Sequence, residues 1–204
     1  MQIQKFVLGN LRSNAYIVFN ETNCFIVDPG FENDLISSFI KDHGLTLDFI
    51  YITHGHYDHI GGVKELKDQY HPMVYAPIKD KFWLDEYAIQ KLGYQIPVDQ
   101  YFMEPFELKW QDLTLKFYDT PGHSEGGTVC YIEELGVLFS GDTLFFQTIG
   151  RTDIPYADYD TLIQSVKNIY QLFPNHVRVY PGHGRTTDIA HEKKHNPFVT
   201  GNDV

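Results

Sequence analysis

The sequence lacks a long hydrophobic run, an excess of positive charge and a recognisable signal segment. No uninterrupted apolar stretch approaches the roughly 20 residues that a membrane-spanning helix needs, and Met1 to Phe6 contain no apolar core with a cleavage site. The 16 Lys and Arg residues are outnumbered by 27 Asp and Glu residues, which gives a formal net charge of -11. This negative net charge argues against a surface that binds nucleic acid or an anionic membrane. We therefore expect a cytoplasmic protein that binds neither.

Cysteine is scarce, and low-complexity sequence is missing altogether. The only two cysteines, Cys24 and Cys130, each stand in an apolar run typical of a strand. We expect two buried thiols, with a disulfide between them as the alternative. No internal repeat or flexible linker divides the chain, and its 43% hydrophobic content suffices for one sizeable core or two small packed layers. We therefore predict one domain over residues 1–204.

Short apolar runs, turn residues and amphipathic stretches alternate along the chain. Runs rich in β-branched and aromatic residues predict strands, and apolar residues at helical spacing predict helices. Glu32 or Asn33 is the expected cap of the first helix, and Asp158 that of the last long one. The expected strands are 3–8, 15–19, 24–27, 47–52, 73–76, 106–110, 113–118, 128–132, 136–139 and 177–180, and the expected helices are 34–42, 63–67, 78–92, 159–172 and a short one near 191–195.

This order of elements, strands followed by helices and then the same again, predicts an α/β fold. Two β-sheets packed face to face, with helices outside both, would bury the apolar runs. Residues 82–102 are dense in aromatic side chains, and helical spacing accounts for much of this as core or lid packing. The alternative is a cap that lines a substrate pocket with aromatic surface.

One stretch, residues 53–62, stands out because four side chains that bind metals fall within six positions. His54, His56, Asp58 and His59 follow an apolar run that predicts a buried strand. Alternation along an extended segment would point His54 and His56 to the same side, whereas Asp58 and His59 would lie past the strand end. Carboxylate and imidazole ligands together suit Zn²⁺, Fe²⁺ or Mn²⁺ without selecting one of them.

Three further ligand candidates follow later strands. His123 and His183 each lie in a Gly-His turn directly after a predicted strand, and Asp142 follows another. We predict a dinuclear site in which Asp142 bridges two ions and a shared position is left for water, which two metals would ionise near neutral pH. The ligands of one ion would be His54, His56 and His123, and those of the other Asp58, His59 and His183.

These motifs resemble those of the metallo-β-lactamase superfamily. Thr-His-Gly-His-Tyr-Asp-His-Ile-Gly-Gly at 53–62 is similar to its T-H-x-H-x-D-H-x-G-G signature, and segments 120–124, 140–143 and 181–184 resemble its later motifs in the same order. The resemblance covers nearly the whole chain. It implies that superfamily's fold, a four-layer αβ/βα sandwich of two mixed β-sheets with helices on both outer faces. It also implies two divalent metal ions, with zinc expected and iron or manganese as alternatives.

Several branches of the superfamily can be weighed residue by residue. The commonest class B β-lactamases have Cys as a ligand where this chain has Asp142, and the flavo-diiron branch has Glu at the position of His56. Nucleic-acid-cleaving members carry extra domains or basic surfaces, which the acidic balance here does not support. The short bacterial form of glyoxalase II remains closest, because residues 145–153 resemble the segment after its bridging Asp.

Resemblance to glyoxalase II implies hydrolysis of S-D-lactoylglutathione or a related small thioester. A metal-bound hydroxide would attack the thioester carbonyl, Asp58 would orient it, and Arg151 would hold a substrate carboxylate. For Arg151, an ion pair with Asp153 or Asp158 is the alternative. The chain ends without the C-terminal helical region that supplies further glutathione contacts in the long enzymes, so the thiol part of the substrate stays open.

Other functions of the same superfamily remain as alternatives. A persulfide dioxygenase would use one Fe²⁺ held by residues matching His54, His123 and Asp142 and would consume O₂. A lactonase of the same superfamily is a further alternative. A metal-binding protein without catalysis belongs to a third class. The oligomeric state is not determined by the sequence. The remaining histidines are expected at the surface: His43, His71, His176, His191 and His195.

Overall fold

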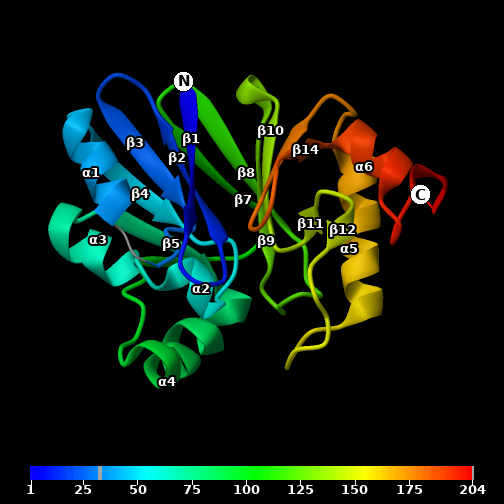
Figure 1. Ribbon diagram of the computed structural model, residues 1–204, viewed down its shortest axis with the longest axis horizontal. Coiled ribbons are helices and arrows are strands. Elements are labelled where there is room, and N and C mark those ends of the chain that lie inside the picture. The colour runs from blue at the N-terminus through cyan, green and yellow to red at the C-terminus, as the bar shows by residue number, and fades with distance from the viewer. Residues whose placement is uncertain (32–33, 204) are drawn as a thin grey trace. The chain divides into compact units, whose positions relative to one another are not determined.

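The computed structural model of the chain describes residues 1–31 and 34–203. Two compact units make up the chain, Met1–Phe102 and Met103–Val204, here termed the first and the second unit (Figure 1). The expected cap of the first helix, Glu32 or Asn33, lies outside the described residues. Within those residues, no helix combines the length and the apolar composition that crossing a bilayer requires. One domain over the whole chain stays a prediction.

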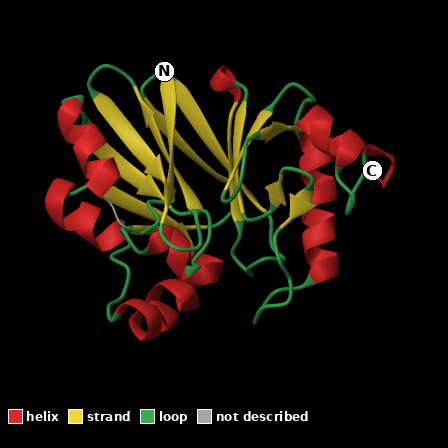
Figure 2. Cartoon of the chain, in the orientation of Figure 1, coloured by secondary structure: helices red, strands yellow, loops and turns green. Residues whose placement is uncertain are grey.

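The first unit is built on a six-stranded mixed sheet. Its strands are β1 (Gln2–Leu8), β2 (Ser13–Phe19), β3 (Asn23–Val27), β4 (Thr46–Tyr51), β5 (Met73–Pro77) and β6 (Gln100–Phe102), in that spatial order. The first three strands are antiparallel, and β3 to β6 are parallel. The helices are α1 (Asp34–Asp42), α2 (Tyr57–Ile60), α3 (Val63–Tyr70) and α4 (Ala88–Leu92). Figure 2 shows α1 and α3 lying along the same side of this sheet.

The core of the first unit lies between this sheet and its helices. β2 is buried along its whole length, and α1 buries Ile36 and Ile40 in the same apolar cluster. The neighbours β3 and β4 are parallel, with Val27 paired to Tyr51. The residues that follow these two strands therefore reach the same edge of the sheet, where residue 28 meets residues 53–59.

Residues 78–92, predicted as one helix, are helical but irregular. A 3₁₀ turn (Ile78–Asp80) and a π-helical turn (Trp83–Tyr87) precede α4. Asp80 is fully buried, and its Oδ2 accepts a hydrogen bond of 2.8 Å from the main-chain N–H of Gly55. The prediction of a helical segment over these residues is confirmed, and the hydrogen bond from Gly55 shows that Asp80 supports the loop after β4.

Most of the aromatic segment 82–102 packs within the first unit. Trp83 and Phe102 are buried, and Tyr94 and Tyr101 pack against the apolar cluster. The Tyr94 hydroxyl donates a 2.7 Å hydrogen bond to the carbonyl oxygen of Gly61. The expectation of core packing is confirmed for these side chains. A role in lining a substrate pocket stays a prediction.

The second unit is built on another six-stranded mixed sheet. In spatial order its strands are β14 (Thr187–Asp188), β13 (Arg178–Pro181), β10 (Val137–Gly141), β9 (Thr128–Ile132), β8 (Leu113–Asp119) and β7 (Phe106–Trp110). β10 and β13 are parallel, and the other neighbours are antiparallel. A small hairpin joins β11 (Leu144–Phe145) to β12 (Thr148–Ile149). The helices are α5 (Tyr159–Leu172) and α6 (Ile189–His195).

Helix α5 packs along this second sheet and supplies much of its core (Figure 2). It begins as predicted, with the Asp158 carboxylate accepting a 2.8 Å hydrogen bond from the N–H of Thr161. Leu162, Val166 and Ile169 are buried on its inner side. The α/β class with two mixed sheets and helices is confirmed.

Both cysteines are free and buried, as the sequence predicts. Burial, with the nearby Asp48 carboxylate, raises the pKa of the Cys24 thiol to about 12, and burial raises the pKa of Cys130 well above its ordinary value. Because only the thiolate reacts with alkylating agents, we expect neither thiol to be labelled by iodoacetamide at pH 8 in the folded protein. Mass spectrometry should show two labels after unfolding in urea. Rapid native labelling of either residue would contradict the burial.

Candidate metal centre

The loop after β4 and the short helix α2 carry the four ligand candidates of the first unit. The chain bends at Thr53 and His54 instead of continuing as the extended segment that the sequence predicted. The rings of His54 and His56 are nevertheless neighbours, with centroids 4.8 Å apart. Gly55 between them packs so closely that an added Cβ would lie 2.4 Å from the Cβ of Trp83. Only glycine fits there, so the loop is held firmly against the aromatic segment.

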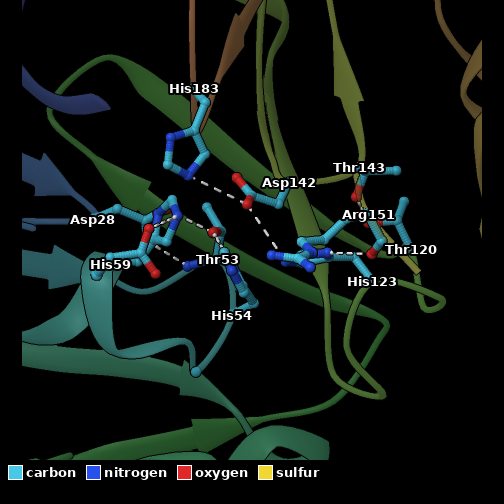
Figure 3. Close-up of polar contacts among 12 residues, drawn as sticks. Asp28, Thr53, His54, His59, Thr120, His123, Asp142, Thr143, Arg151 and His183 are labelled. Atoms are coloured by element: carbon cyan, nitrogen blue, oxygen red, sulfur yellow. Dashed lines mark hydrogen bonds and ion pairs between the residues drawn. The ribbon is translucent and has the colours of Figure 1, made fainter. Parts of the chain in front are cut away.

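Asp28, at the end of β3, orients this loop through hydrogen bonds. Its Oδ1 accepts a 2.8 Å bond from the N–H of Thr53, and its Oδ2 accepts a 2.6 Å bond from the Thr53 hydroxyl. The same Oδ2 lies 3.1 Å from Nδ1 of His59. Figure 3 shows Asp28 facing both side chains. Asp28 is buried and adopts a φ of 50°, in the left-handed region that Asp tolerates better than most residues.

The direction of these hydrogen bonds determines where two imidazoles carry their protons. A carboxylate only accepts, so Nδ1 of His59 donates to Asp28 and its Nε2 is left with a lone pair. The Thr53 hydroxyl gives its proton to Asp28, so its oxygen accepts from Nδ1 of His54, 2.9 Å away. Nε2 of His54 is thereby also left with a lone pair. Support of this kind is typical of histidines that bind metals.

Asp58 lies in the first turn of α2, next to these histidines. Its Oδ2 is 3.5 Å from Nε2 of His59, and its main-chain carbonyl accepts a 2.7 Å hydrogen bond from the Ser13 hydroxyl. One ligand atom from each of Asp28, His54 and His59 falls within a 4.8 Å group. Because Asp28 is already engaged by Thr53 and His59, we assign it an orienting role and leave the ligand role to the other side chains.

The second unit brings its three ligand candidates together around one carboxylate. Oδ2 of Asp142 lies 3.4 Å from Nε2 of His123 and 3.5 Å from Nε2 of His183. Figure 3 shows both imidazoles directed at Asp142. Asp142 and His183 follow β10 and β13, which are parallel neighbours, and the N–H of Gly182 donates a 2.8 Å bond to the carbonyl of Gly141. The sheet therefore positions this pair directly.

These donor sets suit a divalent metal ion. Two ligands that bind one ion tetrahedrally at about 2.1 Å lie about 3.4 Å apart. The carboxylate–imidazole spacings are 3.4 Å and 3.5 Å in the second unit and 3.5 Å in the first. Nitrogen and oxygen donors without a thiolate are acceptable to zinc, iron and manganese.

Arg151 contributes to this half of the site through its main chain. Its carbonyl oxygen lies 2.9 Å from Nδ1 of His123, which leaves Nε2 of that imidazole to face Asp142. Its side chain forms two hydrogen bonds with Asp153, of 2.8 Å and 2.9 Å. Asp153 thereby raises the pKa of Arg151, and its own pKa is lowered by Arg151. The ion pair with Asp153 is therefore present, while binding of a substrate carboxylate by Arg151 stays a prediction.

Gly150 is in the closest contact with the ligand-bearing loops. A Cβ added there would lie 1.9 Å from the carbonyl oxygen of Asp142 and 3.2 Å from Cβ of His123. We expect Gly150→Ala to lower the free energy of unfolding by about 3 kcal/mol or more, because the main chain must move, and to weaken metal binding. Thermal unfolding and chelator competition would measure the two effects.

The matched control for Gly150→Ala is Gly44→Ala. Gly44 has open space around it and a φ of 63°, so that variant carries only the local cost of a positive φ, about 1 kcal/mol. Equal losses in the two variants would show that the contact with Asp142 is unimportant.

Sequence reasoning missed the residues that orient the ligand-bearing loop, Asp28, Thr53 and Asp80, and it also missed one buried carboxylate elsewhere, Glu192. Asp28 directly follows β3, and its hydrogen-bond partners Thr53 and His59 are 25 and 31 residues away in the sequence. Glu192 is fully buried and accepts hydrogen bonds from the N–H of Gln147, the Thr187 hydroxyl and the Asn196 amide. A charged residue on an amphipathic tail gives no signal of such burial.

The metallo-β-lactamase superfamily model matches residues 8–183 of this chain. The chain belongs to the metallo-β-lactamase superfamily. A probable metallo-hydrolase of Bacillus subtilis, YqgX, is 34% identical over 98% of the chain and 99% of the relative. The hydroxyacylglutathione hydrolase GloC of Haemophilus influenzae is 32% identical and covers 98% of each chain. These matches place the protein among the metallo-hydrolases of the superfamily.

Two solved structures of superfamily members share the fold at comparable identity. The B3 metallo-β-lactamase BLEG-1 aligns with a TM-score of 0.90 at 35% identity, covering 98% of this chain and all of that one. TTHA1623, solved in a di-iron-bound form, aligns with a TM-score of 0.85 at 34% identity, covering 96% and 100%. The superfamily fold is thus confirmed, and a divalent-metal site is supported with the metal identity left open.

Proposed function

We propose that this protein is a thioester hydrolase of the glyoxalase II type. The observation that carries the proposal is its 32% identity to GloC along nearly the full length of both chains, together with an intact set of ligand candidates. S-D-lactoylglutathione, or a related small thioester, is the proposed substrate. The acidic net charge of -11 supports a small-molecule substrate over nucleic acid or an anionic membrane. A cytoplasmic location is part of the same proposal.

The proposed metal centre holds two divalent ions, with zinc expected. Asp142 would bridge them, since one carboxylate offers two oxygens. The carboxylate–imidazole distances within each unit support this arrangement. That ligands from the first and the second unit bind the same ion is itself part of the proposal. The ligands of one ion would be His54, His56 and His123, and those of the other Asp58, His59 and His183.

The residues of the first unit have defined tasks in this scheme. When bound, the metals supply an ionised water near neutral pH and polarise the substrate carbonyl. Asp28 and Thr53 keep the protons of His54 and His59 on Nδ1, so that both Nε2 atoms stay available. The carboxylate of Asp58, which lies beside His59, would accept a hydrogen bond from the attacking water and orient it toward the thioester carbon.

β-Lactam hydrolysis is the second candidate, favoured by the 35% identity to BLEG-1 over the full length of that structure. Both reactions add water to an acyl carbon and break its bond to a heteroatom, so the same ligand set would serve either. The two reactions differ in the product: a thioester releases a separate thiol, whereas an opened β-lactam stays one molecule. Substrate assays on the same preparation therefore separate them.

The decisive experiment combines metal analysis with assays on one purified sample. We expect about two metal ions per chain, cleavage of S-D-lactoylglutathione, no hydrolysis of a chromogenic cephalosporin and no oxygen uptake. Cleavage of the cephalosporin alone would replace the proposal by the second candidate. One iron per chain, with oxygen consumed when glutathione persulfide is added, would identify a dioxygenase instead. Lactone hydrolysis without thioester cleavage would identify a lactonase.

A further inference from the structure

The tip of the β11–β12 hairpin is fastened to helix α6. The N–H of Gln147 donates a 2.9 Å hydrogen bond to the buried Glu192, and the Gln147 amide lies 3.0 Å from Nε2 of His191. The ring of His191 also stacks on Phe146, with centroids 4.9 Å apart. His191, expected at the surface, is therefore a packed residue. The hairpin tip is a fixed platform, three to five residues beyond Asp142.

Two adjacent side chains on this platform contact the segment that carries His183. The ring edge of Phe145 meets the imidazole of His183, with centroids 6.0 Å apart. Phe146, the next residue, lies under the guanidinium of Arg185, whose Cζ is 3.4 Å from the ring centroid. Arg185 follows His183 by two residues, which limits the distance between their Cα atoms to about 7.5 Å. The Cα atom of Arg185 thus lies close to that of a ligand candidate, and its guanidinium is held on the neighbouring Phe146.

The contact with Phe146 leaves the hydrogen-bonding edge of Arg185 available. Stacking uses the face of the planar guanidinium, whereas carboxylates bind along its N–H edge. Among the described residues, no Asp or Glu forms an ion pair with Arg185. Arg151 differs, because Nε and Nη2 of its guanidinium already donate to Asp153.

We propose that Arg185, held by Phe146, binds a carboxylate on the thiol part of the substrate and so determines the preference for anionic thioesters. This assignment rests on the proposed thioester hydrolysis. It gives the recognition role to a residue fixed in place by stacking. An aromatic platform under a cation also lowers the ordering cost of binding, because the side chain is already in place.

The test compares two thioesters that differ in the charge of the thiol part. S-D-lactoylglutathione carries carboxylates, and S-D-lactoyl-N-acetylcysteamine carries none. We expect Arg185→Ala to raise KM for the first about tenfold or more with kcat nearly unchanged, and to leave KM for the second unaltered. Arg185→Lys keeps the positive charge but loses the planar guanidinium, so this variant should lose most of the affinity for S-D-lactoylglutathione as well. Arg178→Ala is the matched control, since Arg178 also lies over a ring, 5.9 Å from that of Tyr180.

A binding measurement keeps this inference separate from the proposed reaction. Calorimetric titration with S-methylglutathione, a thioether that cannot be hydrolysed, should show about tenfold weaker binding to Arg185→Ala. If the wild-type protein cleaves neither thioester but shows this binding difference, the proposed function fails and the role of Arg185 stands. Equal KM and equal binding in Arg185→Ala would overturn the inference. A tenfold rise in KM in Arg151→Ala, with Arg185→Ala unaffected, would also overturn it in favour of Arg151.

Discussion

Replacing Asp142 by alanine is expected to remove both metal ions and reduce hydrolysis to the background rate. In the proposed arrangement this carboxylate serves both ions, and its Oδ2 lies 3.4 Å and 3.5 Å from Nε2 of His123 and His183. Without it, the two imidazoles lose the charged ligand that balances the cations. Metal content by mass spectrometry and initial rates with S-D-lactoylglutathione would be measured on the same preparation.

Asp112→Ala provides the control for this variant. Asp112 is an exposed residue of the turn between β7 and β8, so removing its charge should change neither metal content nor rate. Circular dichroism would confirm that both variants are folded. Substantial activity in Asp142→Ala with one metal retained would show that the mechanism does not need a dinuclear site.

Asp28→Asn is expected to weaken metal binding about 10- to 100-fold with little change in the stability of the metal-free protein. Asparagine keeps the shape of the side chain and tolerates the φ of 50° that Asp28 adopts. Its Oδ1 can still accept from the N–H of Thr53, but its amide nitrogen donates where Oδ2 accepted. Nδ1 of His59 must then accept, which moves the proton to Nε2 and blocks the ligand atom.

Competition with a chromogenic chelator would measure the affinity, and thermal unfolding with excess chelator would measure the stability. Asp28→Ala serves for comparison, since it leaves the buried N–H of Thr53 without its acceptor, at a cost of about 1–3 kcal/mol for that group alone. A loss of stability as large in Asp28→Asn as in Asp28→Ala, with metal affinity unchanged in both, would contradict the role in proton placement.

The sequence predicted the long elements well because their signals are local. The bounds of α1 and α5 agree with the predicted 34–42 and 159–172, since helical spacing and, for α5, a capping Asp define them. The three-residue strand β6 and the two-residue strands β11, β12 and β14 were missed. Such short segments hold their conformation through neighbours that are distant in the sequence, and no periodicity develops over two or three residues.

The candidate ligands were predictable because each follows a strand in a Gly- or Asp-containing turn. The structure brings them together within each unit, and their binding of metal stays a prediction. The orienting contacts were not predictable, because Asp28 and Asp80 act through hydrogen bonds to residues that are distant in the sequence. Arg151 shows the limit most plainly. The resemblance implied a substrate contact, with an ion pair to Asp153 or Asp158 as the alternative. The structure shows the pair with Asp153 and a contact of the Arg151 carbonyl with His123, and the substrate contact stays a prediction.

The division of strands between the two sheets has a consequence for biosynthesis. All strands of the first sheet precede residue 103, so its main-chain partners have all been made before His123 leaves the ribosome. Domains generally fold in the order of their synthesis, and residues 53–59 would take up their loop early. In the proposed arrangement, however, one ion lacks its bridging ligand until Asp142 has been translated, and the other lacks a ligand until His183 has been translated. Binding of the second ion is therefore expected to follow synthesis of almost the entire chain, whereas the first could bind once Asp142 has left the ribosome.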